Sequence, residues 1–567
     1  MACLGIDLGT SNSLIAVFDD DGPRLLPNAL GEYLTPSVVG LADDNQTLLV
    51  GKPAKMRLVR HPSLTAARFK RLMGTPKQIR LGRRSYSAVE LSAMVLKSLK
   101  ADAEAALGCA VTDVVISVPA YFNALQRQAT KDAAEIAGLT VQRLINEPTA
   151  AALASGVQNR DEESSFVVLD LGGGTFDVSI LEMFEGVMEV RASSGDAFLG
   201  GDDFTEALAR HAATKAGIDW SRLDPAGLEA LLALAEDAKR RLAAGRSVTG
   251  RAAVGGREVE LTISDDEFAA LTEPLLERMR RPIEASFYDS GLSADQVDRV
   301  ILVGGATRMA AVRSLAARVF RQLPDGRVDP DHAVALGAAV QAGLVSKHQG
   351  LRDVVMTDLA PFSLGIDTAR RISGKRYSTN RFEPLIERNT LLPASRAETF
   401  VTIADNQSEF AMQIFQGESA IASENIKLGD LFVYLPRGPA GQEAVNVRFT
   451  YDPSGLLAVD ATVLSTNRTF SNVIDNLASA MPAAEKAKRL KEMEALKLDV
   501  REQAENVTLL ETLKHLHEVL LGNDRLLLAR LLDEFDSALA CQDPRVIAAE
   551  RTRVSELARQ IQENYVR

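Results

Sequence analysis

The chain has 567 residues, of which 46% are hydrophobic and 25% charged, and its formal net charge is −12. This length predicts three or four domains with substantial cores. The negative charge argues against nucleic acid as the main partner, because nucleic-acid binding depends on neutralising phosphates. The sequence lacks an apolar run of about 18 residues and a leader pattern at its start, so we expect no membrane partner and a cytoplasmic location.

Two glycine-rich turns of similar chemistry stand far apart in the chain, at Asp7-Leu8-Gly9-Thr10 and Asp170-Leu171-Gly172-Gly173-Gly174-Thr175. Apolar runs flank both, so each is predicted to be a strand, a tight turn and a returning strand. Glycine lets backbone N–H groups approach an anion, and threonine adds a hydroxyl donor. The aspartates would repel phosphate unless a divalent cation lay between them. The pattern predicts an α/β, actin-like duplicated ATPase that binds a nucleotide with Mg²⁺; two ordinary hairpins are the alternative.

The first part of the chain, up to about residue 350, alternates apolar strands with helical stretches such as 88–107 and 228–244. This alternation is typical of a layered α/β region. Neither a P-loop nor a Rossmann glycine pattern occurs in it. A short apolar segment between aspartates follows at 353–358, and we expect it to be an interdomain linker.

Beyond the linker the pattern of hydrophobic residues changes. They alternate with period two at 445–451 and 457–463, around an expected turn at 452–455, which predicts a small antiparallel β domain. From residue 481 they recur at three- and four-residue steps, and breaks at Gly522 and Pro544 divide the segment. We therefore expect a compact cap of about three helices; an oligomerisation or stabilising appendage is the alternative.

Four motifs, at 6–13, 118–122, 146–151 and 302–308, carry a family resemblance along nearly the whole chain. The chain resembles the DnaK-type seventy-kilodalton heat-shock chaperones, and its short C-terminal region and Ser11 make it most similar to the HscC branch. The resemblance implies four parts: a nucleotide-binding ATPase domain at 1–352, a linker at 353–358, a β-sandwich peptide-binding domain at 359–480 and a helical lid at 481–567.

The same resemblance implies a catalytic set of Lys55, Glu147, Asp170 and Thr175, in which Lys55 would orient the attacking water. Asp7 and Asp170 would hold Mg²⁺ through water, with K⁺ as an additional cation. The residues implied to bind ATP are Gly9, Thr10, Ser11, Asn12, Gly172, Gly173, Gly174, Glu236, Lys239, Arg240, Gly304, Gly305, Arg308 and Asp331. Without the resemblance, Lys55 would be a solvated surface lysine.

Glu236, Lys239 and Arg240 stand at helical spacing and share one face, which on its own would also suit a surface salt-bridge pattern. The resemblance makes them an adenosine clamp, with Arg308 stacking on the base from the other lobe. Ala243 stands where the family usually has a serine, which removes one hydrogen bond to the base.

Two further groups of residues are implied to carry coupling and peptide binding. Pro119 and Arg127 would relay between the lobes, Arg143 and Asp358 would meet a J-domain cochaperone, and Asp353 and Asp358 flank the linker. The peptide groove would be formed by Ile366, Phe400, Ile403, Phe410 and Met412, although packing in the domain core is an equal alternative for Phe400 and Met412. Phe410 replaces a small β-branched residue, so it should narrow the pocket for a client leucine.

The sequence thus predicts an ATP-dependent chaperone that binds and releases hydrophobic segments of client polypeptides and works with a J-domain cochaperone. The need for a nucleotide exchange factor stays open. Two alternatives remain: a protein of narrow specificity that sequesters one regulatory partner, and a metabolite kinase on the same fold.

Overall fold

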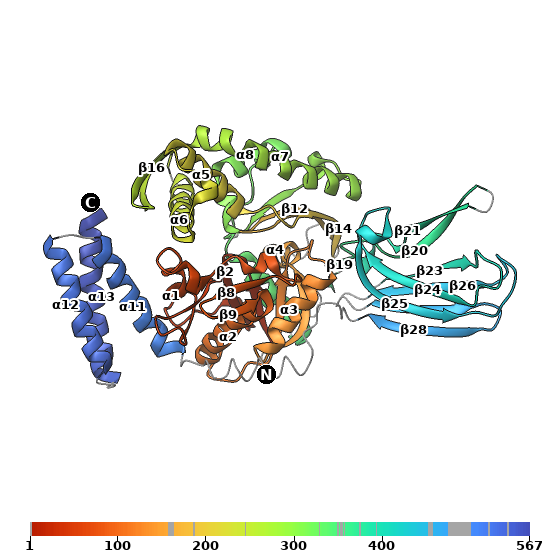
Figure 1. The fold of residues 1–567 in the computed structure, drawn as a ribbon, viewed down its shortest axis with the longest axis horizontal. Helices are drawn as coiled ribbons and strands as arrows, with labels where there is room; N and C mark the ends of the chain where they lie inside the picture. The colour runs from red at the N-terminus through yellow and green to blue at the C-terminus, as the bar shows by residue number, and fades with distance from the viewer. Residues whose placement is uncertain are drawn as a thin grey trace.

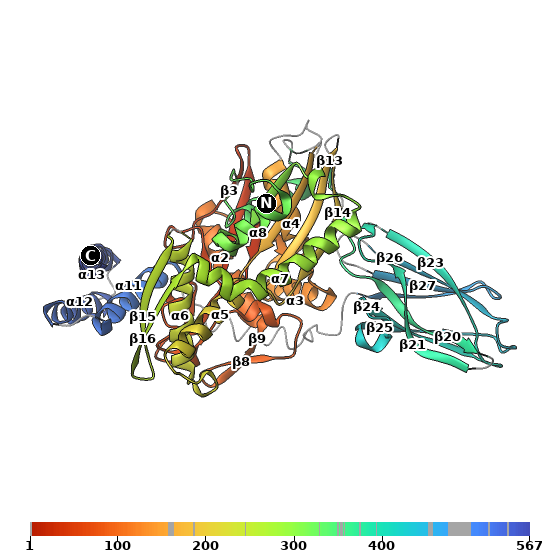
Figure 2. The same ribbon diagram turned by 90° about the horizontal axis from the view of Figure 1, so that it is seen from above.

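A two-lobed body forms the centre of the molecule, with a β domain on one side and a helical bundle on the opposite side (Figures 1 and 2). No helix among the residues described is long and apolar enough to cross a membrane. The structure, a computed structural model, describes residues 3–156, 164–184, 187–243, 245–327, 329–348, 351, 355–356, 358–373, 376–392, 394–451, 457–474, 500–519, 522–540 and 544–566.

The first lobe is built on a sheet of strand order β11-β10-β1-β2-β3. β10 runs parallel to β1 and β11, whereas β2 runs antiparallel to β1, β3 and β4. Helix α9 packs along β1 and β2, and α4 packs against α9. The elements are β1 (Leu4–Leu8), β2 (Asn12–Asp19), β3 (Gly22–Leu25), β4 (Thr35–Pro36), β10 (Asp113–Val118), β11 (Thr140–Asn146), α2 (Ala88–Leu107), α3 (Ala124–Ile136), α4 (Glu147–Gly156) and α9 (Ala333–Val345).

The second lobe repeats the central part of this arrangement. Its sheet has the order β17-β12-β13-β14-β18, in which β12 and β13 are antiparallel like β1 and β2, and β17 lies parallel to β12 as β10 does to β1. The repetition confirms the predicted duplicated fold. The elements are β12 (Ser164–Leu171), β13 (Phe176–Phe184), β14 (Val187–Asp196), β17 (Arg299–Val303), β18 (Val355–Met356), α5 (Gly201–Lys215), α6 (Pro225–Leu242), α7 (Asp265–Ser290) and α8 (Ala310–Phe320).

Local signals in the sequence explain where the long helices begin and end. Ser87 and Glu90 form a reciprocal capping box at the start of α2, and Gly108 ends the helix with a φ of 67°. α2 therefore covers the predicted range, and α6 confirms the second predicted helix with its start moved to Pro225, which follows the N-cap Asp224.

Several short elements decorate the two lobes. Three small sheets and a set of short helices surround the large sheets, and some of them reach the space between the lobes. They are β5 (Val39–Leu41), β6 (Leu48–Val50), β7 (Thr65–Ala66), β8 (Gln78–Leu81), β9 (Arg84–Ser87), β15 (Ser247–Val254), β16 (Arg257–Ser264), α1 (Lys52–Lys55), η1 (Pro62–Leu64), η2 (Phe69–Leu72), η3 (Trp220–Arg222), η4 (Ala294–Gln296) and η5 (Gly305–Arg308).

The expected linker segment contributes two short strands. β18 extends the second-lobe sheet as a parallel neighbour of β14, and β19 (Asp358–Leu359) pairs with β22 (Leu391–Leu392) of the following domain. Asp353 lies outside the described residues. The chain between the body and the β domain is therefore held by strand pairing at both ends.

The β domain consists of two four-stranded sheets packed on a common core. Val445, Val447, Phe449 and Tyr451 are buried, as are the alternate residues of the next strand, which confirms the predicted alternation; the expected turn at 452–455 lies outside the described residues. The elements are β20 (Leu364–Ser373), β21 (Arg376–Ile386), β24 (Glu409–Gln416) and β25 (Ile426–Tyr434) in one sheet, β23 (Ala394–Val401), β26 (Ala444–Tyr451), β27 (Leu457–Val463) and β28 (Arg468–Ile474) in the other, and η7 (Ala422–Glu424).

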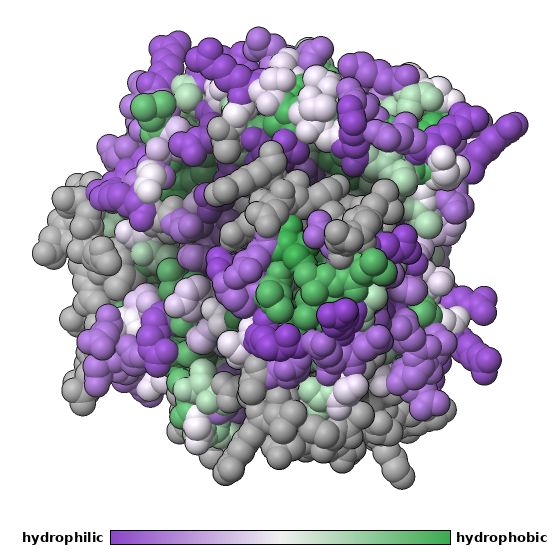
Figure 3. All heavy atoms as spheres, turned by 90° about the vertical axis from the view of Figure 1, so that its left-hand side faces the viewer, coloured by the Kyte–Doolittle hydropathy of each residue, from purple (hydrophilic) through white to green (hydrophobic). Residues whose placement is uncertain are grey.

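The described part of the C-terminal segment forms three helices around an apolar core: α11 (Val500–Val519), α12 (Gly522–Ala540) and α13 (Pro544–Val566). α12 begins at Gly522 and α13 at Pro544, the two positions where the sequence predicts breaks between helices. α11 lies against α1 of the first lobe, away from the β domain. Most of the described surface on this side of the molecule is hydrophilic, and the most extensive hydrophobic patch in this view lies near its centre (Figure 3).

An ion-pair network fastens this bundle to the first lobe. Glu511 of α11 binds Arg57 at 3.0 Å and Arg60 at 2.6 Å, and Arg57 also binds Asp43 at 2.5 Å. The side chains of Arg57 and Glu511 are only 1% and 3% exposed. Breaking such a desolvated pair from one side leaves a buried charge, so the network specifies where the bundle sits.

Candidate active site

A cavity of about 350 Å³ lies between the two lobes. The two glycine turns meet beside it, because a side chain added at Gly173 would touch Ser11 and one added at Gly174 would touch Thr10. Most residues predicted to bind nucleotide or cation line the cavity: Asp7, Gly9, Thr10, Ser11, Asn12, Glu147, Asp170, Gly172, Gly173, Thr175, Glu236, Lys239, Arg240, Gly304, Gly305, Arg308 and Asp331.

Hydrogen bonds to neighbouring elements fix both turns. The N–H groups of Gly201 and Asp202, at the start of α5, donate to the carbonyl oxygens of Gly172 and Gly173 at 2.8 Å each. Ser37 Oγ donates to the carbonyl of Gly9 at 2.7 Å, and a Cβ at Gly9 would lie 2.1 Å from the carbonyl oxygen of Asn12. Rigid glycine turns of this kind are suited to holding phosphate.

Four carboxylates stand near the turns: Glu147, Asp170 and Asp177 are buried, and Asp7 is half-buried. Burial, reinforced by the charge of Glu147, raises the pKa of Asp7 and of Asp177 to about 7, and it raises the pKa of Asp170 in the same direction. Asp170 Oδ2 and Asp177 Oδ2 are buried without a hydrogen-bond partner among the described residues. This surplus of buried negative charge fits a divalent cation.

The described residues contain no group of three His, Cys, Asp or Glu side chains that could cage a metal by themselves. A cation here would therefore complete its shell with water or phosphate oxygens, which Mg²⁺ commonly does. Sequence reasoning missed Asp177, although it directly follows the second turn in Thr175-Phe176-Asp177. Its Oδ1 accepts a hydrogen bond from the backbone N–H of Tyr121 at 3.0 Å.

The structure places two lysines differently with respect to the cavity. Lys55 ends α1, is exposed, and does not line the cavity, although it lies within electrostatic reach of Glu236 and Arg240. Lys70 does line the cavity: it is buried, its Nζ binds Glu147 Oε1 at 2.8 Å, and it lies 5.4 Å from the ring centre of Phe122. The clue in the sequence was weak, since Lys70 is one cation among neighbours in Arg68-Phe69-Lys70-Arg71.

The helix α6 brings the predicted trio to the other end of the cavity. Glu236 binds Lys239 at 2.6 Å and Arg240 at 2.7 Å, and Lys239 also donates to the carbonyl of Gly201 at 2.9 Å. Burial alone would raise the pKa of Glu236, but the charge of Lys239 and the hydrogen bonds that the Glu236 carboxylate accepts lower this pKa to about 2. Ala243 lines the same end of the cavity.

Arg308, on η5, is fixed by two carboxylates across the cavity from this trio. It binds Asp329 at 2.7 Å and Asp331 at 2.8 Å. A guanidinium held in this way presents a planar surface at the edge of the cavity, which suits stacking on a base.

Several predicted coupling residues form a continuous path from the linker to the cavity. Asn146, directly before Glu147, donates to Asp358 at 2.8 Å and accepts a hydrogen bond from Arg127 at 2.7 Å. Arg127 also donates to the carbonyl of Ala120, next to the buried Pro119. Burial raises the pKa of Asp358, partly offset by Arg127 and Arg143. Asn146, which sequence reasoning missed as a coupling residue, is the junction of this path.

The predicted peptide-groove residues do not share one environment. Ile366 and Met412 are buried in the β-domain core, whereas Ile403 is 38% exposed. Phe400 and Phe410 are partly buried, with ring centres 6.3 Å apart and planes at 29°. The two aromatic rings therefore stack on each other at the edge of the core.

Comparisons with known proteins agree with this geometry. A family model described as Hsp70 protein matches residues 3–81 and 77–526. The chain is 42% identical over 486 residues to proteins called chaperone protein DnaK from Thermotoga petrophila, Thermotoga sp. strain RQ2 and Thermotoga maritima; the match covers 83% of this chain and 80% of each relative. The chain therefore belongs to the Hsp70 family, whose members are ATP-dependent chaperones.

Proposed function

We propose that the chain binds Mg²⁺ and ATP in the interlobe cavity, hydrolyses ATP to ADP and phosphate, and uses this cycle to bind and release apolar segments of client polypeptides. The hydrogen bond from Asn146 to Asp358 carries the proposal, because the next residue along the chain is Glu147 and the contact therefore links the segment between the domains to the charged cavity. A change at one site can therefore alter the other by a coupling free energy.

Hydrolysis here depends on positioned charge. Asp7 and Asp170 would hold Mg²⁺ through water, and the ion would neutralise the phosphate oxygens as negative charge shifts to the leaving group. Thr10, Ser11 and Thr175 would donate hydrogen bonds from their hydroxyl groups to the phosphate oxygens. No covalent intermediate with the protein is required.

We assign to Lys70 the role that the sequence suggested for Lys55. Lys70 is the buried cation beside the carboxylates, and Glu147 fixes its Nζ at 2.8 Å. From there it can orient a water molecule at the γ-phosphate and stabilise the growing negative charge. The other end of the cavity would take the adenosine, with Glu236 and Lys239 near the ribose and Arg308 stacked on the base.

The remaining proposals concern the partners, the additional cation, the location and the branch of the family. The proposed partners are client polypeptides and a J-domain cochaperone that engages Arg143 and the Asp358 region, with Asp353 and Asp358 flanking the coupling segment. We also propose K⁺ as an additional cation, a cytoplasmic location and kinship with the HscC branch. The rate of spontaneous ADP release from the wild-type protein measures how far an exchange factor is needed.

A narrow client range is a second candidate function, and the stacked Phe400 and Phe410 favour it. Two aromatic rings in contact leave less room for a branched client side chain than one ring beside a small residue would. Under this proposal the protein captures few partners, with small side chains at the pocket.

The central experiment measures whether ATP controls peptide binding. A fluorescent apolar peptide is bound to the nucleotide-free protein, and its release is followed after ATP and Mg²⁺ are added. We expect much faster release with ATP than with ADP. Equal release rates would contradict the chaperone cycle, and formation of a phosphorylated sugar or polyol instead of free phosphate would identify a metabolite kinase.

A further inference from the structure

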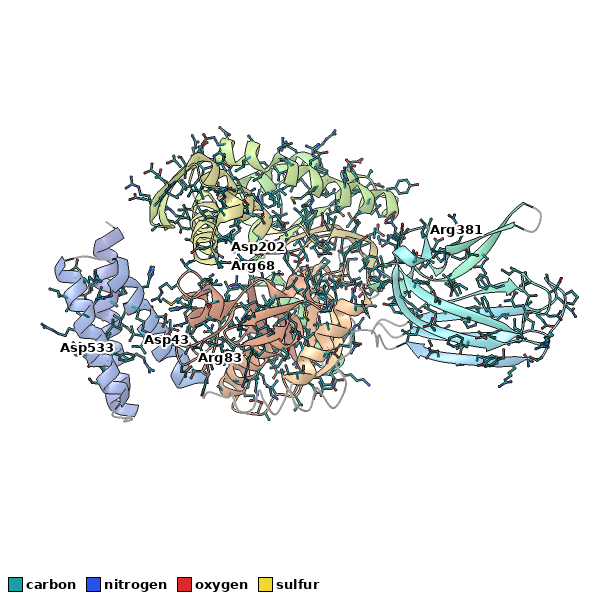
Figure 4. All side chains as sticks on the ribbon, viewed as in Figure 1. Asp43, Arg68, Arg83, Asp202, Arg381 and Asp533 are labelled. Atoms are coloured by element: carbon teal, nitrogen blue, oxygen red, sulfur yellow. The ribbon has the colours of Figure 1, made fainter. Side chains whose placement is uncertain are left out.

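The segment Arg68 to Arg71 carries three cations, and each binds a different carboxylate. Arg68 binds Glu229 at 2.5 Å, Lys70 binds Glu147 at 2.8 Å, and Arg71 binds Asp203. Glu229 and Asp203 belong to α6 and α5 of the second lobe, whereas the segment belongs to the first. Two ion pairs therefore cross between the lobes, one on each side of Lys70. Arg68 lies where the lobes meet, near Asp202 (Figure 4).

The segment is anchored firmly on its own side. Phe69 is 2% exposed and packs in the first-lobe core, with Leu72 packed against the same core. Arg68 has a φ of 60°, a left-handed conformation that residues with a side chain rarely adopt. Such a conformation persists where surrounding contacts hold it, and the bond to Glu229 supplies one of them.

The contact of Arg71 reaches the second phosphate turn. Its Nη2 donates to the carbonyl of Gly174 at 3.2 Å as well as binding Asp203. Asp203 in turn accepts a hydrogen bond from the N–H of Gly200 at 2.8 Å, at the start of α5. Arg71 directly follows Lys70 in the chain, so its contact with Gly174 ties the Lys70 segment to the turn that would hold phosphate.

The contact of Arg68 reaches α6, the helix that also carries Glu236. Glu229 stands seven residues before Glu236 on α6, so the two lie on the same face of that helix. The side chains of Arg68 and Glu229 are 36% and 17% exposed, so water screens this pair only in part. A movement of α6 away from the first lobe would have to break it.

We propose that Arg68 and Arg71 are positioning residues that clamp the lobes over bound nucleotide: Arg71 holds Lys70 against the second phosphate turn, and Arg68 holds α6 and sets the rate of nucleotide release. This inference rests on the proposed ATPase function. It assigns distinct roles to two nearby arginines, because their partners lie on different helices of the second lobe, Asp203 on α5 and Glu229 on α6.

The test separates release from chemistry in the full chain. Release is measured by displacing N-methylanthraniloyl-ADP with excess ADP in the presence of Mg²⁺, and chemistry is measured by single-turnover ATP hydrolysis. We expect Arg68→Ala to release the fluorescent ADP about fivefold faster, the factor that corresponds to losing a partly exposed ion pair. We expect Arg71→Ala to slow single-turnover hydrolysis about tenfold or more, because Lys70 loses its support.

Two controls keep the interpretation specific. Arg83→Ala removes an exposed arginine from the β8–β9 hairpin of the same lobe and should change neither rate (Figure 4). The exchange of charges in Arg68→Glu with Glu229→Arg should restore slow release, whereas each single change should give fast release. Restoration also shows that the variants fold.

The outcomes distinguish this inference from the proposed function. If wild type binds and hydrolyses ATP but Arg68→Ala releases the fluorescent ADP within 1.5-fold of wild type, or the charge exchange fails to restore slow release, the clamp is refuted. Undiminished single-turnover hydrolysis in Arg71→Ala refutes the role of Arg71. If wild type does not bind the fluorescent ADP at all, the proposed function itself fails.

Discussion

At the scale of single residues, burial distinguishes the two lysines considered for the chemical step. Lys55 and Lys70 are fifteen positions apart and look similar in the sequence, but only Lys70 is buried beside Glu147. A cation shielded from bulk water interacts more strongly with developing charge than an exposed one. We therefore expect Lys55 to influence the reaction less than Lys70 does.

The first prediction concerns this pair. Lys70→Ala should lower the ATP hydrolysis rate by on the order of 10²-fold or more, while ATP still binds, since the phosphate turns stay intact. Lys55→Ala is the matched control and should stay within about threefold of wild type. Single-turnover hydrolysis with radiolabelled ATP gives both rates. A severe defect in Lys55→Ala combined with a mild one in Lys70→Ala would reverse our assignment.

The buried carboxylates give the nucleotide-free protein a defined dependence of stability on pH. Burial raises the pKa of Asp177 to about 7 in the folded protein, against the ordinary value of 3.8 in the unfolded chain. Between these values the folded state keeps a proton that the unfolded state loses, so the free energy of unfolding falls as pH rises from about 4 to 7. Above pH 7 the penalty of the ionised, buried carboxylate stays constant.

Asp177→Asn should remove this penalty, while its side-chain oxygen can still accept the hydrogen bond from Tyr121 N–H. In buffer without nucleotide or Mg²⁺, we expect the variant to be more stable than wild type at pH 8 and to lose that advantage near pH 4. Each kcal/mol would raise Tm by roughly 2–4 °C. Thermal melts at both pH values test this, with the exposed Asp533→Asn as control. An advantage of equal size at both pH values would argue against a buried, ionised Asp177.

At the scale of elements, the sequence predicts best what neighbouring residues determine. The bounds of α2 follow from the Ser87 capping box and Gly108, both of which act within one helical turn. The glycine turns and the period-two strands of the β domain are local patterns of the same kind. The position of these turns and strands, and which strand residues are buried, could therefore be predicted from the sequence.

Long-range packing was not predictable in this way. Lys70 is 77 residues from its partner Glu147, and Arg57 is 454 residues from Glu511. Nothing near either residue indicates which distant carboxylate it meets, since charged residues are common on any helix surface. The groove residues show the same limit, because alternation could not tell the buried Met412 from the more exposed Ile403.

Phe410 on strand β24 has two possible roles: it restricts the peptide pocket, or it supports the core of the β domain. Phe410→Val would remove one ring of the stack with Phe400. If the ring narrows the pocket, leucine-centred peptides should bind up to roughly tenfold more tightly, since burying a leucine contributes about 1.5–3 kcal/mol. Fluorescence anisotropy of a labelled leucine-rich peptide gives the dissociation constant.

Thermal melts of the same full-length variant provide the control. Loss of about 1–3 kcal/mol of stability without a gain in affinity would place Phe410 in the core and remove the argument for a narrow client range. A tighter complex with an unchanged melting temperature would support the restricted pocket.

At the scale of the whole molecule, the helical bundle and the β domain occupy opposite sides of the ATPase body. The β domain contacts the body through Arg388 and Asn389, which bind Asp289 at 3.1 and 2.9 Å. The bundle contacts it through Glu511 and the first-lobe arginines. In this arrangement the bundle does not cover the β domain, so a lid function requires it to leave the first lobe.

The last prediction tests what holds the bundle there. Glu511→Ala should release α11 from the first lobe, because Arg57 would lose one of its two carboxylates while 99% buried, and removing one partner of a buried pair costs about 3–5 kcal/mol. Dyes placed at positions 83 and 533 in a cysteine-free background would report the separation by energy transfer. We expect lower transfer efficiency and a broader distribution of distances than in wild type.

Glu534→Ala is the matched control, because Glu534 pairs with Arg553 inside the bundle and not with the first lobe. It should leave the transfer efficiency unchanged even if it lowers the melting temperature slightly. Unchanged transfer in Glu511→Ala would mean that apolar contacts of α11 with α1 hold the bundle without the ion pairs. Reduced transfer in Glu511→Ala alone would identify the Glu511 network as the contact that must break before the bundle can reach the β domain.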